Sequence, residues 1–189
     1  MKLRWLVPAL LLLATSAHAD PGWTLGVAFP WDVMHTDGET DLGVFGLGLD
    51  VARTLDDRWT LGVAAEGSFV MDIRPDAPIG SEVEPMGRLR VGLEWRYIVA
   101  TGTAWATQRC GPDFEVQART WIGGRAGVET FDEGTTFGRF AEVVIGRERV
   151  FDHVAFGPYF AAGVSDEPAA FAAPVIRPYA TIGIRIGGA

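Results

Sequence analysis

The sequence predicts an all-β fold in which eight antiparallel strands, joined in chain order, close into an up-and-down barrel. Apolar residues alternate with small or polar residues along most of the chain, which is the period of a strand with one apolar face. Segments rich in Gly, Pro, Asp and Glu separate eight such stretches. The six residues Trp-Thr-Leu-Gly-Val-Ala occur at 23–28 and again at 59–64, an offset of 59 − 23 = 36 residues that accommodates one hairpin.

The first nineteen residues predict a secretory signal peptide, which leaves residues 20–189 as a single barrel domain. Lys2 and Arg4 precede the apolar run Trp5–Ala14, and Ala17-His18-Ala19 has the small residues of a cleavage site. The mature chain then has 189 − 19 = 170 residues, with 16 − 2 = 14 arginines against 24 acidic residues and no lysine. Its formal charge of 14 − 24 = −10 argues against a nucleic-acid partner. A single cysteine excludes an intrachain disulfide.

The first four strands are expected at residues 23–32, 45–52, 59–73 and 88–99. In the first three, apolar residues occupy the odd positions, while Thr, Gly, Ala, Asp and Glu occupy most of the even ones. The fourth alternates most regularly, since Leu, Val, Leu, Trp, Tyr and Val stand at odd positions between charged residues and Gly. A helix through 88–99 would have apolar stripes too narrow to bury, so the strand is preferred.

The last four strands are expected at residues 114–129, 137–149, 154–164 and 176–186. The alternation is least regular in 137–149, where Ala141, Val143 and Ile145 oppose a face that includes Phe140 and Val144. Turn-forming residues lie between the strands, for example Asp132-Glu133-Gly134. The link 100–111, which contains Cys110, is long for a tight turn and could hold a short extra strand or a helical turn.

The polar face of the predicted strands indicates which side of the barrel is the interior. It carries equal numbers of acidic residues and arginines, and an eight-stranded interior is just wide enough for side chains to fill. Buried charges need partners, and the planar guanidinium of arginine suits paired carboxylates. We therefore expect a polar, charge-paired lumen, with Gly46, Gly48, Gly62, Gly92 and Gly127 making room for long arginines. The expected lumen charges are Asp50, Glu66, Asp72, Glu94, Glu115, Glu129 and Glu142 with Arg88, Arg90, Arg96, Arg119, Arg125, Arg177 and Arg185.

A soluble, exported lipocalin-like barrel that binds an apolar ligand is the alternative, because a solvated outer face can also carry balanced charges. Two observations favour the transmembrane barrel. A soluble surface normally includes lysine, which the mature chain lacks. Large aromatic residues also stand near the ends of the apolar faces, as in the girdles at two membrane interfaces. The expected girdle consists of Trp23, Trp31, Trp59, Trp95, Tyr97 and Phe114.

In this pattern and length, residues 22–188 resemble the small eight-stranded outer-membrane barrels, including OmpA-type barrel domains. The resemblance implies a Gram-negative outer membrane, termini in the periplasm, and outer-membrane lipids and the barrel assembly machinery as partners. It places the longer loops, at 33–41, 74–86, 131–136 and 165–174, outside the cell; they carry much of the excess acid. One difference is the C-terminus, Gly187-Gly188-Ala189, where such barrels usually end in an aromatic residue. The expected role is structural or surface interaction without a large pore.

The sequence predicts no catalytic site, metal site or cofactor. His35 stands near Asp32, Asp37 and Glu39 in a predicted outer loop, where a solvated acidic loop is preferred over a weak cation site. Two isolated histidines do not make a zinc site, and the lone cysteine has no catalytic partner nearby in sequence. The alternative is a lipid-modifying outer-membrane enzyme that uses His153 or His35.

Overall fold

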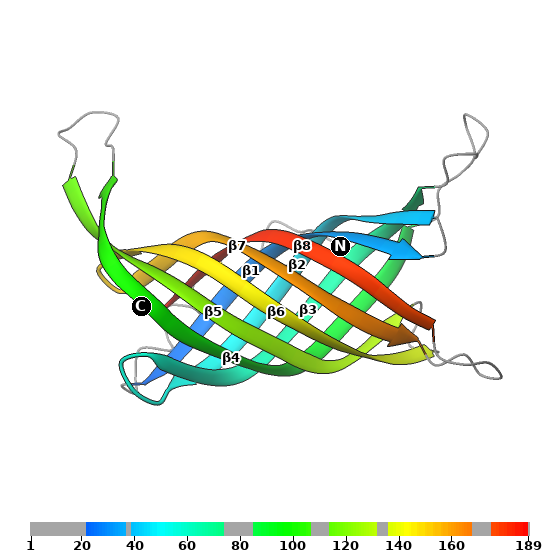
Figure 1. Ribbon diagram of the computed structural model, residues 1–189, viewed down its shortest axis with the longest axis horizontal. Helices are drawn as coiled ribbons and strands as arrows, with labels where there is room; N and C mark the ends of the chain where they lie inside the picture. The colour runs from blue at the N-terminus through cyan, green and yellow to red at the C-terminus, as the bar shows by residue number, and fades with distance from the viewer. Residues whose placement is uncertain are drawn as a thin grey trace, which may run out of the picture.

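The computed structural model describes residues 22–36, 39–73, 85–106, 114–131, 136–167 and 175–188, and it confirms an all-β barrel. The eight strands pair in chain order, each antiparallel to the next, and β1 pairs with β8 to close the ring (Figure 1). Hydrogen bonding round the whole ring removes the exposed edges of an open sheet. The strands are β1 (Trp23–Thr36), β2 (Glu39–Thr54), β3 (Trp59–Ile73), β4 (Pro85–Ala106), β5 (Phe114–Phe131), β6 (Thr136–Phe151), β7 (Val154–Glu167) and β8 (Val175–Gly188).

The register gives the barrel a large stagger. Hydrogen-bonded partners lead from Met34 on β1 through β8, β7, β6, β5, β4, β3 and β2 and return to β1 at Thr24, which is 34 − 24 = 10 residues away. Such a stagger requires the strands to tilt by about 40° from the barrel axis. Side chains far apart in sequence therefore meet inside the barrel at the same depth.

Two short connections mark one end of the barrel, called the turn end below. Asp152 and His153 join β6 to β7, and Asp152 adopts a φ of 54°, a left-handed conformation that aspartate tolerates better than most residues. Residues 55–58 join β2 to β3, and there the Asp56 carboxylate accepts hydrogen bonds from the backbone N–H groups of Arg58 and Trp59, both at 2.7 Å. This arrangement is an Asx turn, in which an aspartate side chain accepts backbone hydrogen bonds and so stabilises a tight connection.

The first part of the long link between the fourth and fifth strands, residues 100–106, extends β4, whereas residues 107–113 lie outside the described residues. β4 continues to Ala106 and pairs with β5 as far as Phe114, so these two strands project as a hairpin at the turn end (Figure 1). A β-bulge between Ile98 and Ala100 precedes the extension. Because a bulge inserts one residue, it reverses which residues face outward, and this break in the alternation hid the extension in the sequence.

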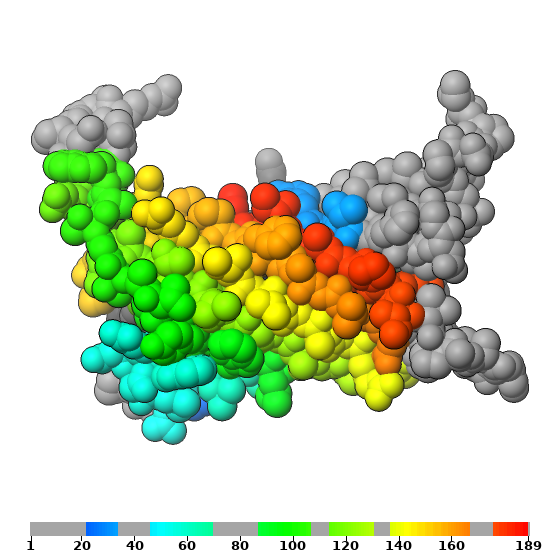
Figure 2. Space-filling view, in the orientation of Figure 1, coloured from blue at the N-terminus to red at the C-terminus, as the bar shows by residue number. Residues whose placement is uncertain are grey.

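Burial confirms the expected polarity of the wall. Leu89 is 49% exposed whereas its neighbour Arg90 is 3% exposed, and the same contrast between apolar outside and charged inside repeats along the strands. Figure 2 shows the strands of one face forming a continuous wall from end to end. Inside, Trp121, Val144, Tyr159 and Ala161 form a small apolar cluster. In the described ranges, no helix is long and apolar enough to cross a membrane.

Candidate functional site

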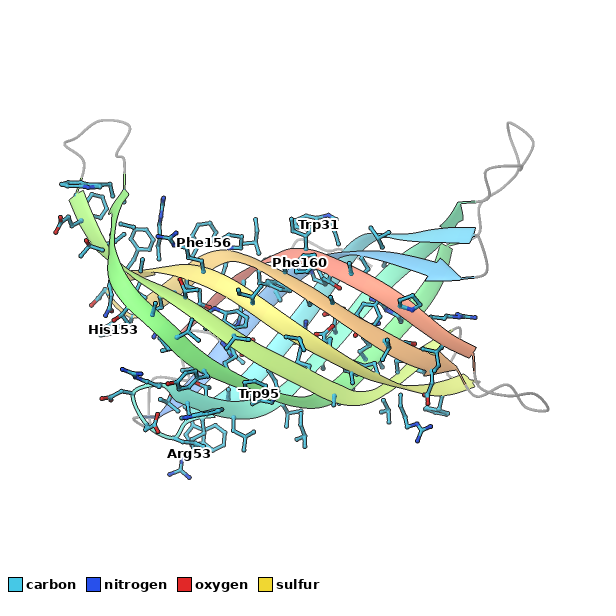
Figure 3. The ribbon with its side chains drawn as sticks, viewed as in Figure 1. Trp31, Arg53, Trp95, His153, Phe156 and Phe160 are labelled. Atoms are coloured by element: carbon cyan, nitrogen blue, oxygen red, sulfur yellow. The ribbon has the colours of Figure 1, made fainter. Side chains whose placement is uncertain are left out.

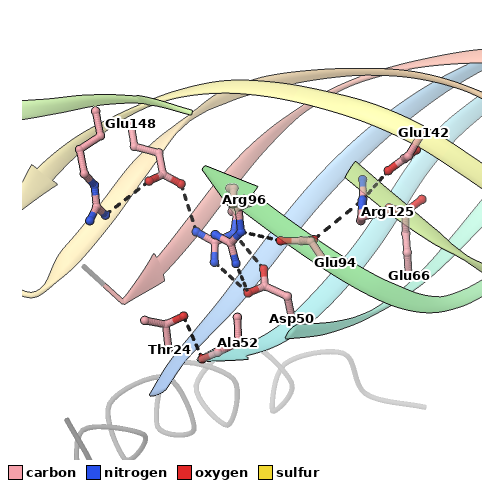
Figure 4. Close-up of polar contacts among 11 residues, drawn as sticks. Thr24, Asp50, Ala52, Glu66, Glu94, Arg96, Arg125, Glu142 and Glu148 are labelled. Carbon is pink, nitrogen blue, oxygen red and sulfur yellow. Dashed lines mark hydrogen bonds and ion pairs between the residues drawn. The ribbon is translucent and has the colours of Figure 1, made fainter. Parts of the chain in front are cut away.

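The candidate site is the charged interior of the barrel, which begins at the turn end with Arg119. Its Nη2 lies 3.5 Å from Glu148 Oε2, and the other oxygen of Glu148 lies 3.1 Å from Arg185 Nη1. Arg185 on β8 reaches over Gly26 of β1 and binds Asp50 on β2 through two nitrogens, Nε and Nη2, both at 2.8 Å. Arg96 Nη2 approaches the same carboxylate at 3.1 Å. Each acid in this half therefore bridges two guanidinium groups (Figure 4).

Arg125 connects this group to the other half of the lumen. Arg96 Nε lies 2.6 Å from Glu94, whose second oxygen is 3.9 Å from Arg125 Nε. Arg125 also contacts Glu142 directly and donates from Nη1 to Glu66 at 3.2 Å. One guanidinium thus serves three carboxylates from β3, β4 and β6, because the stagger brings these strands' residues to one depth.

The network continues to the opposite end of the barrel through Arg88. Its Nη2 lies 3.5 Å from Glu66 and also contacts Asp32, which accepts a further hydrogen bond from the Thr181 hydroxyl. From Arg119 to Asp32, arginines and carboxylates alternate without interruption. Arginine stays protonated at all physiological pH values, so this alternation stabilises the interior but does not supply a chain of groups that can exchange protons.

A second group of charges lies beside this chain. Arg90 Nε donates to Glu129 at 2.8 Å, and the Ser165 hydroxyl donates to the other oxygen of that carboxylate. The guanidinium of Arg90 also lies 3.9 Å from the centre of the Tyr179 ring, a cation–π contact. The Tyr179 hydroxyl donates to Glu142 at 2.9 Å, which links this group to the main network.

The structure places most of the expected lumen charges inside and differs from the expectation at others. Glu115 is exposed, since it lies in the projecting hairpin opposite Trp105 and past the closed ring. The side chain of Asp72 lies outside the described residues. Asp32 and Glu148 also point into the lumen, so seven acids and seven arginines face inward among the described side chains. Both follow from the alternation of their strands, Asp32 after Pro30 and Glu148 after Gly146, and extending that pattern would have found them. Arg177 is half-buried on β8.

The five glycines expected to make room for arginines have other neighbours. A Cβ at Gly62 or Gly127 would meet backbone atoms of the adjacent strand, and one at Gly46 would meet Pro30. Gly48 faces Ala28, and Gly92 faces the backbone of β5 and the Phe140 ring. Space for an arginine is instead provided at Gly26, where a Cβ would lie 2.5 Å from Arg185 Nη2.

Glycines also make room for interior aromatic rings. A Cβ at Gly146 would lie 2.4 Å from the Trp121 ring, and one at Gly183 would lie 2.5 Å from the Tyr159 ring. The two rings therefore lie flat across the neighbouring strand. Trp121 Nε1 and the Tyr159 hydroxyl are buried without a protein partner among the described residues. Both residues line a small cavity with about 20 Å³ of space for the centres of water-sized molecules, enough for one or two bridging waters.

The expected girdle is located on the outer face, with one exception. Trp59 lies between Trp95 and Tyr97, at ring-centre distances of 5.9 and 4.8 Å, and Trp23 is at the same end on β1, which is separated from β3 by β2. Trp31 points outward from β1 nearer the opposite end (Figure 3). Phe114 lies at a different depth from the rest of the girdle. The partner of Tyr97 on β5 is Ile122, and Phe114 is 122 − 114 = 8 residues from it, about 26 Å along the strand. It packs against Phe151 in the projecting hairpin region.

The groups that the sequence offers for chemistry are His35, His153 and Cys110. His153 is exposed in the β6–β7 turn, where its Nε2 lies 3.4 Å from the Asp152 carboxylate. Cys110 and the side chain of His35 lie outside the described residues. Within the part of the chain that the structure describes, no group of three or more His, Cys, Asp or Glu side chains could hold a metal ion.

Comparison with known proteins relates the chain to other small barrels. The crystal structure of Neisserial surface protein A (NspA) matches with a TM-score of 0.56 and 10% identity, over 88% of this chain and 96% of that chain. Ail, the attachment invasion locus protein of Yersinia pestis, matches with a TM-score of 0.42 and 12% identity, over 88% of this chain and 97% of that chain. No protein-family model and no curated protein sequence matches. The expected resemblance to small eight-stranded barrels is confirmed, at the level of the fold.

Proposed function

We propose that this chain is an integral outer-membrane β-barrel protein with a structural or surface-interaction role. The observation that carries the proposal is the polarity of the wall. Apolar side chains such as Leu93, Val143 and Ile182 are at least 60% exposed on the outside, while Glu129 and Arg88 are buried inside. Contiguous apolar surface on this scale is unfavourable in water and marks contact with lipid or with another protein. A closed barrel also satisfies its backbone hydrogen bonds internally, as a bilayer requires.

The soluble lipocalin-like alternative requires the opposite polarity. An apolar ligand would need an apolar interior, whereas the lumen is filled by the network around Arg125 and Arg185. A lipid-facing exterior accounts for both the exposed aliphatic residues and the tryptophans, which prefer membrane interfaces. The predicted signal peptide and the resemblance in fold support export to the outer membrane, with lipids and the barrel assembly machinery as partners.

The proposed role does not involve a large pore or an enzymatic reaction. Seven arginines from β4, β5 and β8 occupy the interior with their carboxylates, and the described cavity accommodates only one or two waters. The charge-paired lumen supports a structural role, because its ion pairs hold the strands in one arrangement. Surface interaction would then depend on the acidic segments at the end opposite the turn end.

Cell fractionation with a heat-shift gel tests the location and insertion. We expect the protein in the outer-membrane fraction, and a folded band that migrates anomalously until the sample is boiled. Recovery of the unboiled protein from the soluble periplasm would refute the proposal. Planar-bilayer recording of the folded protein should detect no large, steady conductance. Lipid A isolated from cells that express His35→Ala or His153→Ala should match lipid A from cells that express the unchanged protein, because neither histidine acts on lipid.

A further inference from the structure

Two exposed arginines interrupt the apolar outer face of β6 near the turn end. Arg147 and Arg149 point outward on either side of Glu148, whose side chain points into the lumen. On the same face, Val143 and Ile145 precede them and are 60% and 49% exposed. A pair of fixed positive charges directly after a lipid-facing apolar stretch is costly unless the charges reach an aqueous or anionic layer.

No carboxylate faces either arginine from the strands on both sides. Arg147 stands opposite Thr120 on β5, and Arg149 stands between Ala118 on β5 and Phe156 on β7. Among the described residues, neither arginine has an ion-pair partner. These neighbours are small or apolar, so they leave the two guanidinium groups accessible from outside.

Arg139, on the same face of β6 but eight residues nearer the opposite end, shows the contrasting situation. Its guanidinium binds the Asp166 carboxylate through Nε and Nη2, at 3.0 and 2.6 Å. That charge is therefore neutralised within the protein, whereas the two charges at the turn end are not. The outer surface of β6 thus carries net positive charge at one end only.

The register places the two arginines at the depth of the aromatic girdle. Hydrogen-bonded partners lead from Tyr97 to Ile122 and then to Ile145. Crossing two tilted strands in this direction moves about 6 Å away from the turn end. Arg147 lies two residues back toward the turn end, about 5 Å along the barrel axis, which returns it to the level of Tyr97. Arg149 lies about 5 Å further on, where lipid headgroups meet water.

We propose that Arg147 and Arg149 form a binding site for the headgroup of an anionic phospholipid in the leaflet at the turn end. Guanidinium groups bind phosphate oxygens in pairs of parallel hydrogen bonds. Alternate residues of one strand face lie about 7 Å apart, so both can reach a single headgroup. The acyl chains would lie along the apolar surface formed by Ile145 and its partner on β7, Phe160. This site rests on the proposed insertion into a membrane.

The test uses the folded barrel in phosphatidylcholine vesicles, with and without phosphatidylglycerol, and native mass spectrometry to count retained lipids. We expect the unchanged protein to retain phosphatidylglycerol preferentially. Each arginine at the membrane interface raises the preference for the anionic lipid about fivefold. The double variant Arg147→Gln with Arg149→Gln should therefore lower this preference about 30-fold at low salt. Replacing both by lysine should keep most of the preference, since lysine keeps the charge. Arg139→Gln is the matched control and should change nothing, because its charge is already paired.

Three outcomes would overturn the inference. The glutamine double variant could retain the lipid as strongly as the unchanged protein, or Arg139→Gln could lower retention equally. Inorganic phosphate in the buffer could displace phosphatidylglycerol completely, which would make the site one for free phosphate. A heat-shift gel on each sample shows that the variants are folded and inserted. Failure of the unchanged protein to insert would refute the proposed function, whereas insertion without lipid preference would refute the headgroup site alone.

Discussion

Replacing Arg125 by methionine removes the guanidinium that three interior carboxylates share. Glu66 and Glu142 would lose contacts at 3.2 Å and closer, and Glu94 would lose one at 3.9 Å. Each acid keeps one other partner: Glu66 keeps Arg88, Glu94 keeps Arg96, and Glu142 keeps the Tyr179 hydroxyl. The free energy of unfolding should therefore fall by the cost of removing one central buried charge, about 3–5 kcal/mol. This is less than the loss of three independent ion pairs would cost.

Equilibrium urea unfolding in lipid vesicles, followed by tryptophan fluorescence, measures this loss. The free energy of unfolding should fall by about 3–5 kcal/mol with an unchanged denaturant slope. Adding Glu142→Gln to Arg125→Met should recover part of the loss, about 1–3 kcal/mol, because it removes one of the uncompensated charges. Arg53→Met, on the outer face of β2, is the control. A loss below about 1 kcal/mol for Arg125→Met would refute the charge-paired lumen.

Three further predictions concern other parts of the wall. Arg90→Met should destabilise the barrel by about 3–5 kcal/mol, and Arg119→Met by about 1 kcal/mol, because the Arg119 side chain is 19% exposed and its contact is 3.5 Å long; the same unfolding assay compares them. Gly146→Ala should cost about 1–3 kcal/mol by displacing an indole ring, while Gly67→Ala, whose Cβ would have nothing within 4 Å, should be neutral. Two backbone hydrogen bonds lower the pKa of Asp56, so NMR should find it titrating below the value for the unfolded chain. That contribution to stability is present above the unfolded-state pKa and is lost as pH falls through the folded-state pKa.

Much of the barrel could be predicted because strands send alternate residues to opposite faces. The opposite orientations of Leu89 and Arg90 follow from the sequence alone, and the number of alternating stretches matches the number of strands. Prediction was weakest where the alternation breaks. The bulge after Ile98 reverses the faces of β4 and extends the strand to Ala106. A local pattern has no means of distinguishing such a bulge from the end of a strand, because bulges are set by pairing with the neighbour.

The sequence predicted that paired charges fill the lumen, but it identified only some of the residues that do so. Among the described side chains, Asp32 and Glu148 are inside although they were not expected there, and Glu115 is outside although it was expected inside. A sequence pattern assigns residues to a face, but it does not state where the closed ring ends. Glu115 obeys the alternation of β5 and is nevertheless exposed, because its hairpin continues past the neighbouring strands.

The partners inside the lumen were decided by the tertiary structure alone. Some pairs are direct neighbours on adjacent strands, such as Arg125 with Glu142. Others cross the barrel or skip a strand, such as Arg185 with Asp50 on β2, which is 135 residues away in sequence. Those contacts depend on the ten-residue stagger and on the small residues that clear a path for each long side chain. Alternation along the chain therefore determines which face is polar, and closure of the ring determines which charge meets which.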